Sequence, residues 1–386
     1  MATVSGAFGS FGRLVAEVSR FIVIPALSVA YVDRRCVFRY SSGKRPSKRQ
    51  GNVYPREVGG IGLSENKTLL LLKPRGFCAG VVRAIDIVRI ALEAFGPPIY
   101  VRKEIVHNRF VVEELQHKGA IFVDDVNEVP EGERVIYSAH GVSPEVREDS
   151  KLRKLRVIDA TCPLVTKVHV EAVKFAREGY SLILIGHRDH DEVIGTLGEA
   201  PGVTQVVGSA AEVADLTVPD PTRIAYLTQT TLSLDETRDI IAALREKFPN
   251  IKGPAAQDIC YATENRQVAV KHVASDADLL LVVGSDNSSN SKRLVEVARS
   301  LGTDAHLIDN DRDIRPEWMT GVKTVALTAG ASAPEHLVEE VVRYLATQGF
   351  KNVQELEIMP ENVRFGLPPE IVETIAAAPA SATMES

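Results

Sequence analysis

The sequence predicts an α/β fold in which three repeated units, each with a small parallel sheet, are arranged like a trefoil. Short apolar runs of strand length alternate with amphipathic helical stretches through most of the 386 residues. This alternation is typical of parallel sheets with crossover helices. A cysteine also opens a helical stretch three times, at Cys78, Cys162 and Cys260, which are 84 and 98 residues apart.

Cys78 lies in a short turn between a predicted strand and a predicted helix. An apolar run at 68–72 precedes it, and apolar residues recur at helical spacing from Val81 to Phe95, where Gly96 ends the helix. The unpaired N–H groups and the dipole at a helix N-terminus lower the pKa of a thiol, and the thiolate is the form that binds metal. The alternative is a small buried cysteine in a turn.

The arrangement around Cys78 recurs around the other two cysteines. Pro163 suits the first position of the helix after Cys162, and the helix after Cys260 runs to about Ala274. The middle polar loop lies 29, 28 and 28 residues after the three cysteines, and the last loop 60, 66 and 68 residues after them. Because ligands bind beyond the carboxyl ends of parallel strands, we expect the polar loops of the three units to form one shared cavity.

Composition and charge exclude several classes of protein. The net charge of −6 divides into +7 for residues 1–50 and −13 for the remainder, and an acidic body argues against nucleic acid as a partner. No apolar run approaches the roughly 20 residues that span a bilayer, so no membrane association is expected. Four cysteines in a chain of this size suit metal ligation in a reducing compartment better than a disulfide framework.

We divide the chain into five segments. Residues 1–66 are rich in Arg and Ser, poor in acidic residues and expected to be disordered, as in a transit peptide or a chain extended by a misassigned start. Cys36 in this segment is interpreted as structurally idle. The three α/β units are assigned to 67–158, 159–256 and 257–350. The tail at 351–386 could add a strand or a lid at 361–365, and its last part is expected to be disordered.

Three thiolates, one from each unit, make an incomplete metal shell. A structural zinc site takes four ligands, usually with paired C-x-x-C spacing, and that spacing does not occur here. A 4Fe–4S cluster normally takes four cysteines, so three would leave one iron open to bind a substrate as a Lewis acid. This argument favours the cluster over zinc, and three unrelated core cysteines remain a third interpretation.

Polar side chains at corresponding loop positions form a second candidate set. Hydroxyls, an amide and imidazoles beside helix N-termini suit an anion such as phosphate or diphosphate. Glu192 is the carboxylate among these loops, and it could donate a proton if the reaction expels a hydroxyl as water. The alternatives are structural histidines, a helix N-cap at 288–290 and a solvated charge at Glu192. The set comprises His107, His140, His190, Thr230, Ser288, Ser289, Asn290 and Ser332.

Eight ordered motifs between Thr68 and Phe365 resemble the LytB family. They are PRGFCAGV at 74–81, VHNR at 106–109, SAHGVS at 138–143, DATCPLV at 159–165, TQTTLS at 228–233, DICYAT at 258–263, GSDNSSNS at 284–291 and TAGASAP at 328–334. The resemblance implies an oxidoreductase that converts 4-hydroxy-3-methylbut-2-enyl diphosphate to isopentenyl and dimethylallyl diphosphate, the last step of the non-mevalonate isoprenoid pathway. It also implies that the three units surround a central iron–sulfur cluster.

Roles for individual residues follow from the same resemblance. It implies that Cys78, Cys162 and Cys260 hold one 4Fe–4S cluster with an open iron, to which the allylic hydroxyl of the substrate binds. Thr230 would hydrogen-bond near this hydroxyl, and Glu192 would supply protons. Two electrons would come from a ferredoxin- or flavodoxin-like donor. The diphosphate would lie among His107, His140, His190, Ser288, Asn290 and Ser332, with Ser289 alongside.

The chain departs from the family pattern in two places. The family usually has His-Pro-Glu where this chain has His190-Asp191-Glu192, so an extra charge lies beside the predicted proton donor. The N-terminal extension is also atypical. The core looks closer to bacterial than to plant members, which favours a bacterial cytoplasm over a plastid. The rival functions are a non-catalytic iron–sulfur redox sensor or electron carrier, and a zinc-bound hydrolase with Glu192 as base.

Overall fold

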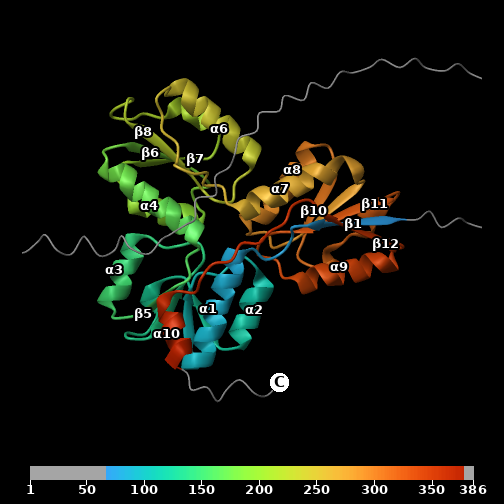
Figure 1. Cartoon of the computed structure of the whole chain (residues 1–386), viewed down its shortest axis with the longest axis horizontal. Coiled ribbons are helices and arrows are strands. Elements are labelled where there is room, and N and C mark those ends of the chain that lie inside the picture. Colours follow the sequence, from blue (N-terminus) through green and yellow to red (C-terminus); the bar gives the residue numbers. More distant parts are fainter. Residues whose placement is uncertain (1–66, 378–386) are drawn as a thin grey trace, which may run out of the picture. The chain divides into compact units, whose positions relative to one another are not determined.

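The computed structural model describes residues 67–377, and the expectations for residues 1–66, Cys36 and the end of the tail fall outside this range. Over the described residues, the chain forms three parallel sheets with helices packed around each (Figure 1). The predicted α/β class with three small parallel sheets is therefore confirmed. None of the helices within 67–377 combines the length and the apolar character needed to cross a bilayer.

The strands of the three sheets are short, and all their pairings are parallel. One sheet has the order β10 (Asp304–Ile308), β9 (Leu279–Val283), β11 (Thr324–Ala329), β1 (Thr68–Lys73) and β12 (Asn352–Glu357). The second has the order β3 (Ala120–Val123), β2 (Ile99–Arg102), β4 (Arg134–Tyr137) and β5 (Arg156–Asp159). The third has the order β7 (Thr204–Val207), β6 (Ser181–Ile185) and β8 (Ile224–Thr228).

The helices bury apolar stripes against these sheets. Several helices begin at a polar residue whose side-chain oxygen caps the helix. Asn108, Ser143, Ser233 and Ser288 each accept a hydrogen bond from a backbone N–H of the first helical turn. The helices are α1 (Ala79–Phe95), α2 (Arg109–His117), α3 (Pro144–Leu152), α4 (Pro163–Arg177), α5 (Asp191–Glu199), α6 (Leu234–Lys247), α7 (Tyr261–Val273), α8 (Ser289–Ser300), α9 (Glu335–Thr347) and α10 (Pro369–Ala377).

The strand before Cys78 differs from the expected division into units. The sequence places this strand in the first unit, 67–158, whereas β1 lies between β11 and β12 in the sheet built mainly from the third unit. The reason is its nearly continuous apolar sequence, because a strand of this kind must be covered on both faces. Leu69 packs into the core on one face of the sheet and Leu70 into the core on the other.

This placement makes the repeat cyclic. Cys162 follows β5, which pairs with β4, and Cys78 follows β1, which pairs with β11. Before Cys260, Lys252 forms a parallel bridge with Ala225 of β8. In each case the backbone leading to a cysteine lies beside the strand that ends in a polar loop, so each cysteine is placed next to that loop.

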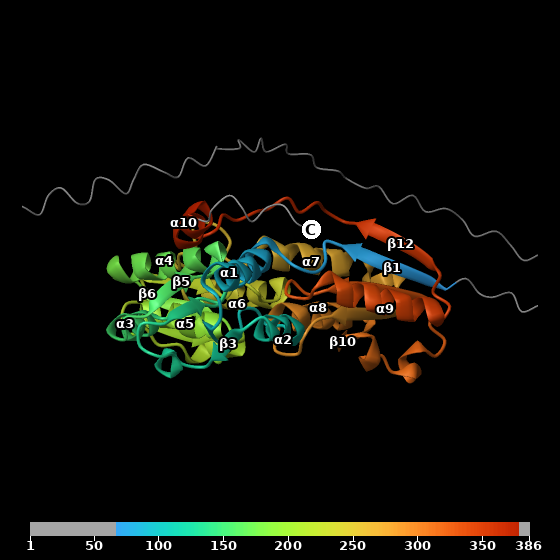
Figure 2. The ribbon, with the colours of Figure 1, turned by 90° about the horizontal axis from the view of Figure 1, so that it is seen from below.

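The tail adds a strand and a helix, at positions other than the one expected. The added strand is β12 rather than 361–365, and it extends the sheet on the free edge of β1. Beyond β12 the chain crosses to α10, which packs against α1 and buries Ile371 in the core around that helix (Figure 2).

Candidate functional site

A cavity of about 100 Å³ lies where the carboxyl ends of strands from all three sheets meet. All twelve residues predicted from the sequence line it, although they come from loops as far apart as 78 and 332. The shared cavity expected from the repeat is thus present, while the binding and catalytic roles of its residues remain predictions. These residues are Cys78, His107, His140, Cys162, His190, Glu192, Thr230, Cys260, Ser288, Ser289, Asn290 and Ser332.

Each cysteine occupies the N-cap of a helix, and its backbone is anchored in the same way. The backbone N–H groups of Cys78, Cys162 and Cys260 donate to carbonyl oxygens of the last polar loops, those of Ala331, Ala139 and Thr230 respectively, at 3.1, 3.0 and 3.0 Å. A repeated backbone bond of this kind fixes where each thiol enters the cavity. The three side chains therefore approach one another from three different helix N-termini.

The thiols of Cys162 and Cys260 do not have the low pKa expected from a helix N-terminus. Burial, and secondarily the neighbouring Cys78, raises the pKa of Cys162 to about 12 and that of Cys260 to about 11. The expectation was wrong for these two because desolvation outweighs the dipole. A thiol in such surroundings loses its proton when a positive charge compensates the thiolate, and a thiolate-binding metal supplies such a charge.

Gly80 keeps open the space between two of the sulfur atoms. A Cβ at this position would lie 2.8 Å from Sγ of Cys162 and 3.8 Å from Sγ of Cys78. Any larger residue would therefore push on the Cys162 sulfur. Three soft sulfur donors around a space kept open by glycine fit a metal or iron–sulfur group.

The three histidines form one cluster. The His107 and His140 rings stack with centroids 4.0 Å apart, and the His190 ring stands edge-on at 5.4 and 5.8 Å. Burial, followed by the other imidazoles, lowers the pKa of His190 to about 3 and moves that of His140 well below its usual range. A neighbouring anion would stabilise the protonated form of these histidines, because its negative charge offsets the repulsion between protonated rings.

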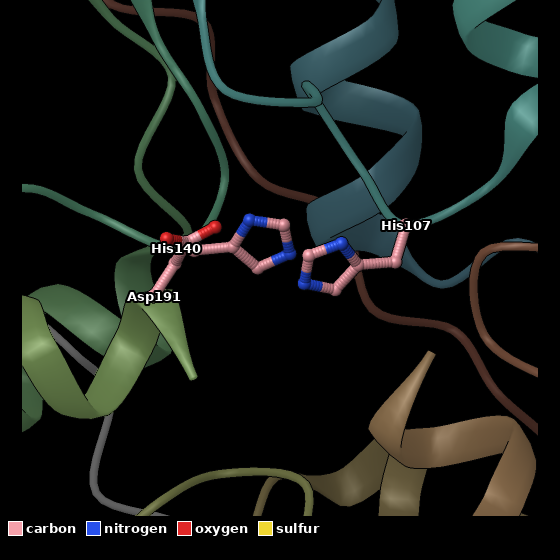
Figure 3. Close-up of side chains that lie close together, drawn as sticks. All are labelled: His107, His140 and Asp191. Atoms are coloured by element: carbon pink, nitrogen blue, oxygen red, sulfur yellow. The ribbon is translucent and has the colours of Figure 1, made fainter. Parts of the chain in front are cut away.

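Asp191 joins this cluster. Its carboxylate and the ring nitrogens of His107 and His140 can present atoms that all lie within 4.8 Å of one another (Figure 3). Figure 3 shows that the three side chains reach this point from separate parts of the chain. The departure from the family pattern therefore places its charge at the histidines rather than on a remote surface.

The hydroxyl and amide groups of Ser288, Ser289, Asn290 and Ser332 are held mainly by hydrogen bonds to the backbone. Ser332 Oγ donates to the carbonyl oxygen of His107 at 2.9 Å and lies 3.4 Å from Ser288 Oγ. Asn290 Oδ1 accepts from the backbone N–H of Ala331 at 3.0 Å. Ser289 Oγ donates to the carbonyl oxygen of Thr231 at 2.9 Å. Ser288 caps α8, as the N-cap interpretation predicts, and it also lines the cavity. The hydrogen bonds of this set fix its polar groups before any ligand binds.

Glu192 is not a solvated loop charge. Its side chain is only 2 % exposed, in the first turn of α5. It accepts hydrogen bonds from the backbone N–H of Thr230 at 2.6 Å and from Thr230 Oγ1 at 3.0 Å. Burial is the main influence on this carboxyl and raises its pKa to about 7, despite these two bonds. A carboxyl with such a pKa can hold a proton and release it near neutral pH.

Sequence reasoning missed three residues that support the site. Thr263 Oγ1 lies 3.2 Å from Cys260 Sγ and accepts from Asn290 at 3.1 Å; its position one helical turn after Cys260 could have indicated this. Gln229 accepts from the backbone N–H of His187 and so fixes the loop before α5. His169 of α4 is 5 % exposed, and its ring packs against Gly141 and Gly195, where a Cβ atom would touch it. Periodicity does not reveal this contact, because it joins distant segments of the chain.

Comparison with known proteins gives consistent matches. The model of the LytB protein family matches residues 69–346. The chain is 55 % identical over 309 residues to the 4-hydroxy-3-methylbut-2-enyl diphosphate reductase of Azoarcus sp. (strain BH72), which covers 80 % of this chain and 99 % of that protein.

Two solved structures are also similar. One is the E-1-hydroxy-2-methyl-but-2-enyl-4-diphosphate reductase from Plasmodium falciparum, with 44 % identity, a TM-score of 0.79, and coverage of 81 % of this chain and 98 % of that one. The other is an (E)-4-hydroxy-3-methyl-but-2-enyl diphosphate reductase described as the terminal enzyme of the non-mevalonate pathway. It has 32 % identity, a TM-score of 0.53, and coverage of 73 % of this chain and 99 % of that one.

Proposed function

The chain belongs to the LytB protein family, and from this membership we infer that it is a 4-hydroxy-3-methylbut-2-enyl diphosphate reductase. It is an oxidoreductase of the non-mevalonate isoprenoid pathway, and the reaction is a two-electron reductive dehydroxylation that gives isopentenyl and dimethylallyl diphosphate. The observation that carries this function is the single cavity in which three thiols, three histidines and a buried carboxyl meet. A sensor or carrier has no need of such an anion site.

We propose that this enzyme holds an iron–sulfur cluster, of 4Fe–4S type, through Cys78, Cys162 and Cys260. The sulfur donor set and the space at Gly80 support this assignment. Three ligands would leave one iron open, and the bound cluster would supply electrons and a Lewis-acid position for the allylic hydroxyl. Zinc is less suitable, because three thiols are one ligand short of its usual structural site.

The histidine cluster and the hydroxyls opposite it are proposed to bind the diphosphate. Imidazoles that repel one another when protonated are stabilised by an anion between them. Ser288, Asn290 and Ser332 add fixed dipoles, and the N-terminus of α8 adds backbone N–H groups. Together these groups would orient the substrate with its hydroxyl toward Thr230.

Glu192 and Thr230 are proposed to handle the protons. The reaction consumes two protons, one that leaves with the hydroxyl as water and one that ends on carbon. Glu192 carries a proton more readily than an ordinary carboxyl because it is buried. Its bond to Thr230 Oγ1 at 3.0 Å offers a path from this carboxyl to the substrate hydroxyl.

Anaerobic turnover tests the function directly. The protein is purified without oxygen, supplied with a reduced viologen dye, and given 4-hydroxy-3-methylbut-2-enyl diphosphate. We expect the dye to be oxidised and both isomeric diphosphates to form. Absence of turnover in protein that contains iron and sulfide would instead favour the redox sensor or electron carrier.

Binding of inorganic pyrophosphate should tighten as the pH is lowered from about 8 to about 6. Because His140 and His190 have lowered pKa values before an anion binds, they are neutral, and a bound anion raises these values so that binding takes up protons. Each proton taken up strengthens binding by up to about tenfold per pH unit. Calorimetry in buffers of different ionisation enthalpy measures this uptake. His190→Asn should reduce the proton uptake relative to wild type. Protonation of pyrophosphate itself contributes equally in the two proteins, so equal uptake by wild type and His190→Asn would contradict the prediction.

We further propose a ferredoxin- or flavodoxin-like protein as electron donor, because the reaction needs two electrons at low potential. A bacterial cytoplasm is the proposed compartment, supported by the likeness to bacterial relatives. A plastid would require residues 1–66 to act as a transit peptide.

A further inference from the structure

The chain between β12 and α10, residues 358–368, passes over α7 and α1, the helices that begin after Cys260 and Cys78 (Figure 2). We call this segment the C-terminal strap. It begins beside β1, where the backbone N–H of Ile358 donates to the carbonyl oxygen of Lys73 at 3.0 Å. It ends where α10 packs on α1. Figures 1 and 2 show the strap passing from β12 over α7 and α1 to reach α10.

Arg266 of α7 ties the strap to two of the cysteine turns. This side chain is 0 % exposed and lies six residues after Cys260. Its Nη1 donates to Glu361 Oε1 of the strap at 2.9 Å. Its Nη2 donates to the carbonyl oxygen of Gly76, two residues before Cys78, at 2.7 Å. One guanidinium therefore joins the helix of Cys260, the turn of Cys78 and the strap.

Arg83 of α1 ties the strap to the third cysteine turn. Its Nε donates to the carbonyl oxygen of Gly366 in the strap at 2.7 Å. Its Nη1 donates to the carbonyl oxygen of Thr161, the residue before Cys162, at 3.1 Å. Because Arg83 lies on the helix that Cys78 begins, it also couples the turns of Cys78 and Cys162 to each other.

The chemistry of these contacts suits a device for positioning. The fork of a guanidinium holds several acceptors in one rigid geometry. Its acceptors here include backbone carbonyl oxygens of the cysteine turns, so the bonds fix the turns themselves. The buried charge of Arg266 requires Glu361, whose side chain is 15 % exposed, because an unpaired buried charge is strongly unfavourable. The strap thus supplies the counter-charge on which the arrangement depends.

We propose that the C-terminal strap fixes the spacing of the three cysteines, with Arg266, Arg83 and Glu361 as positioning residues, and thereby determines how firmly the iron–sulfur cluster is held. This inference rests on the proposed function, because it requires the cluster. It adds a role for the tail, whose residues within the described range contribute nothing to the lining of the cavity. Outer-shell contacts of this kind orient metal ligands and change metal affinity by about 10- to 100-fold.

Iron release from the full-length holoenzyme tests the strap. Wild type, Glu361→Gln, Arg83→Met and the control Glu357→Gln are prepared anaerobically, and excess ferrous chelator is added while the visible absorption of the cluster is followed. Glu357 is exposed and lies on β12 next to the strap. We expect release to be about tenfold faster in Glu361→Gln and in Arg83→Met. Release from Glu357→Gln should equal that from wild type.

The thermal unfolding midpoint of the same samples, stripped of iron, separates positioning from simple stabilisation. Unchanged iron release in Glu361→Gln and Arg83→Met would overturn the proposal, whatever happens to the midpoint. If Glu361→Gln does not fold, Arg83→Met decides by itself, since it leaves the Arg266–Glu361 pair intact. A wild-type protein that binds no iron would refute the proposed function, whereas iron held equally well by all variants would refute only the role of the strap.

Discussion

Glu192→Gln is expected to lower turnover by about 100-fold or more while leaving the iron content unchanged. Glutamine has the shape of the carboxyl and can still accept the hydrogen bond from the Thr230 backbone at the position of Oε1, which is 2.6 Å in the wild type. It cannot release a proton as an acid. Steady-state turnover with reduced viologen and iron analysis of the same sample provide the measurement. Glu113→Gln, an exposed carboxylate on α2, serves as the matched control.

The pH dependence of stability gives this prediction a second test. The folded-state pKa of Glu192 is raised from 4.5 to about 7, so the folded protein binds this proton more tightly than the unfolded chain does. The resulting stability is complete below the unfolded value, is lost as the pH rises through about 7, and amounts to on the order of 3 kcal/mol. Glu192→Gln should lose this dependence. Undiminished turnover in Glu192→Gln would remove the residue from the mechanism.

Cys162→Ser is expected to abolish turnover and to lower bound iron by more than the 10- to 100-fold that follows from losing an outer-shell contact. A serine hydroxyl does not provide the thiolate that a cluster needs, and the cavity lining described within residues 67–377 contains no fourth cysteine to replace it. Iron and sulfide analysis of anaerobically purified protein, together with the visible spectrum, measures the loss.

Cys36→Ser is the control for Cys162→Ser, because Cys36 lies outside the repeat of the other three cysteines. It should keep full iron content and turnover. Retention of wild-type iron by Cys162→Ser would show that the cluster, if present, has other ligands. Loss of iron in Cys36→Ser would show that the sequence repeat does not identify the ligands.

The sequence by itself determined the repeated α/β pattern and the composition of the cavity. The recurrence of a cysteine before a helix indicated which thiols belong together, because the same local signals recur at Cys78, Cys162 and Cys260. Polar loops at matching distances predicted His107, His190 and Ser288 in one place. These inferences succeeded because strand and helix periods are local, and because parallel sheets place the ends of their strands on one side.

Only the tertiary structure decided which segments are partners. The sequence could not show that β1 leaves its neighbours to join β11, since a buried apolar strand fits any central position. It could not show that Glu192 is 2 % exposed or that the thiols of Cys162 and Cys260 are too buried for a low pKa, because desolvation depends on all the surrounding segments. The bonds of Arg266 to Gly76 and Glu361 join residues 190 and 95 positions apart. Contacts at such separations arise from packing the whole chain, which local periodicity does not encode.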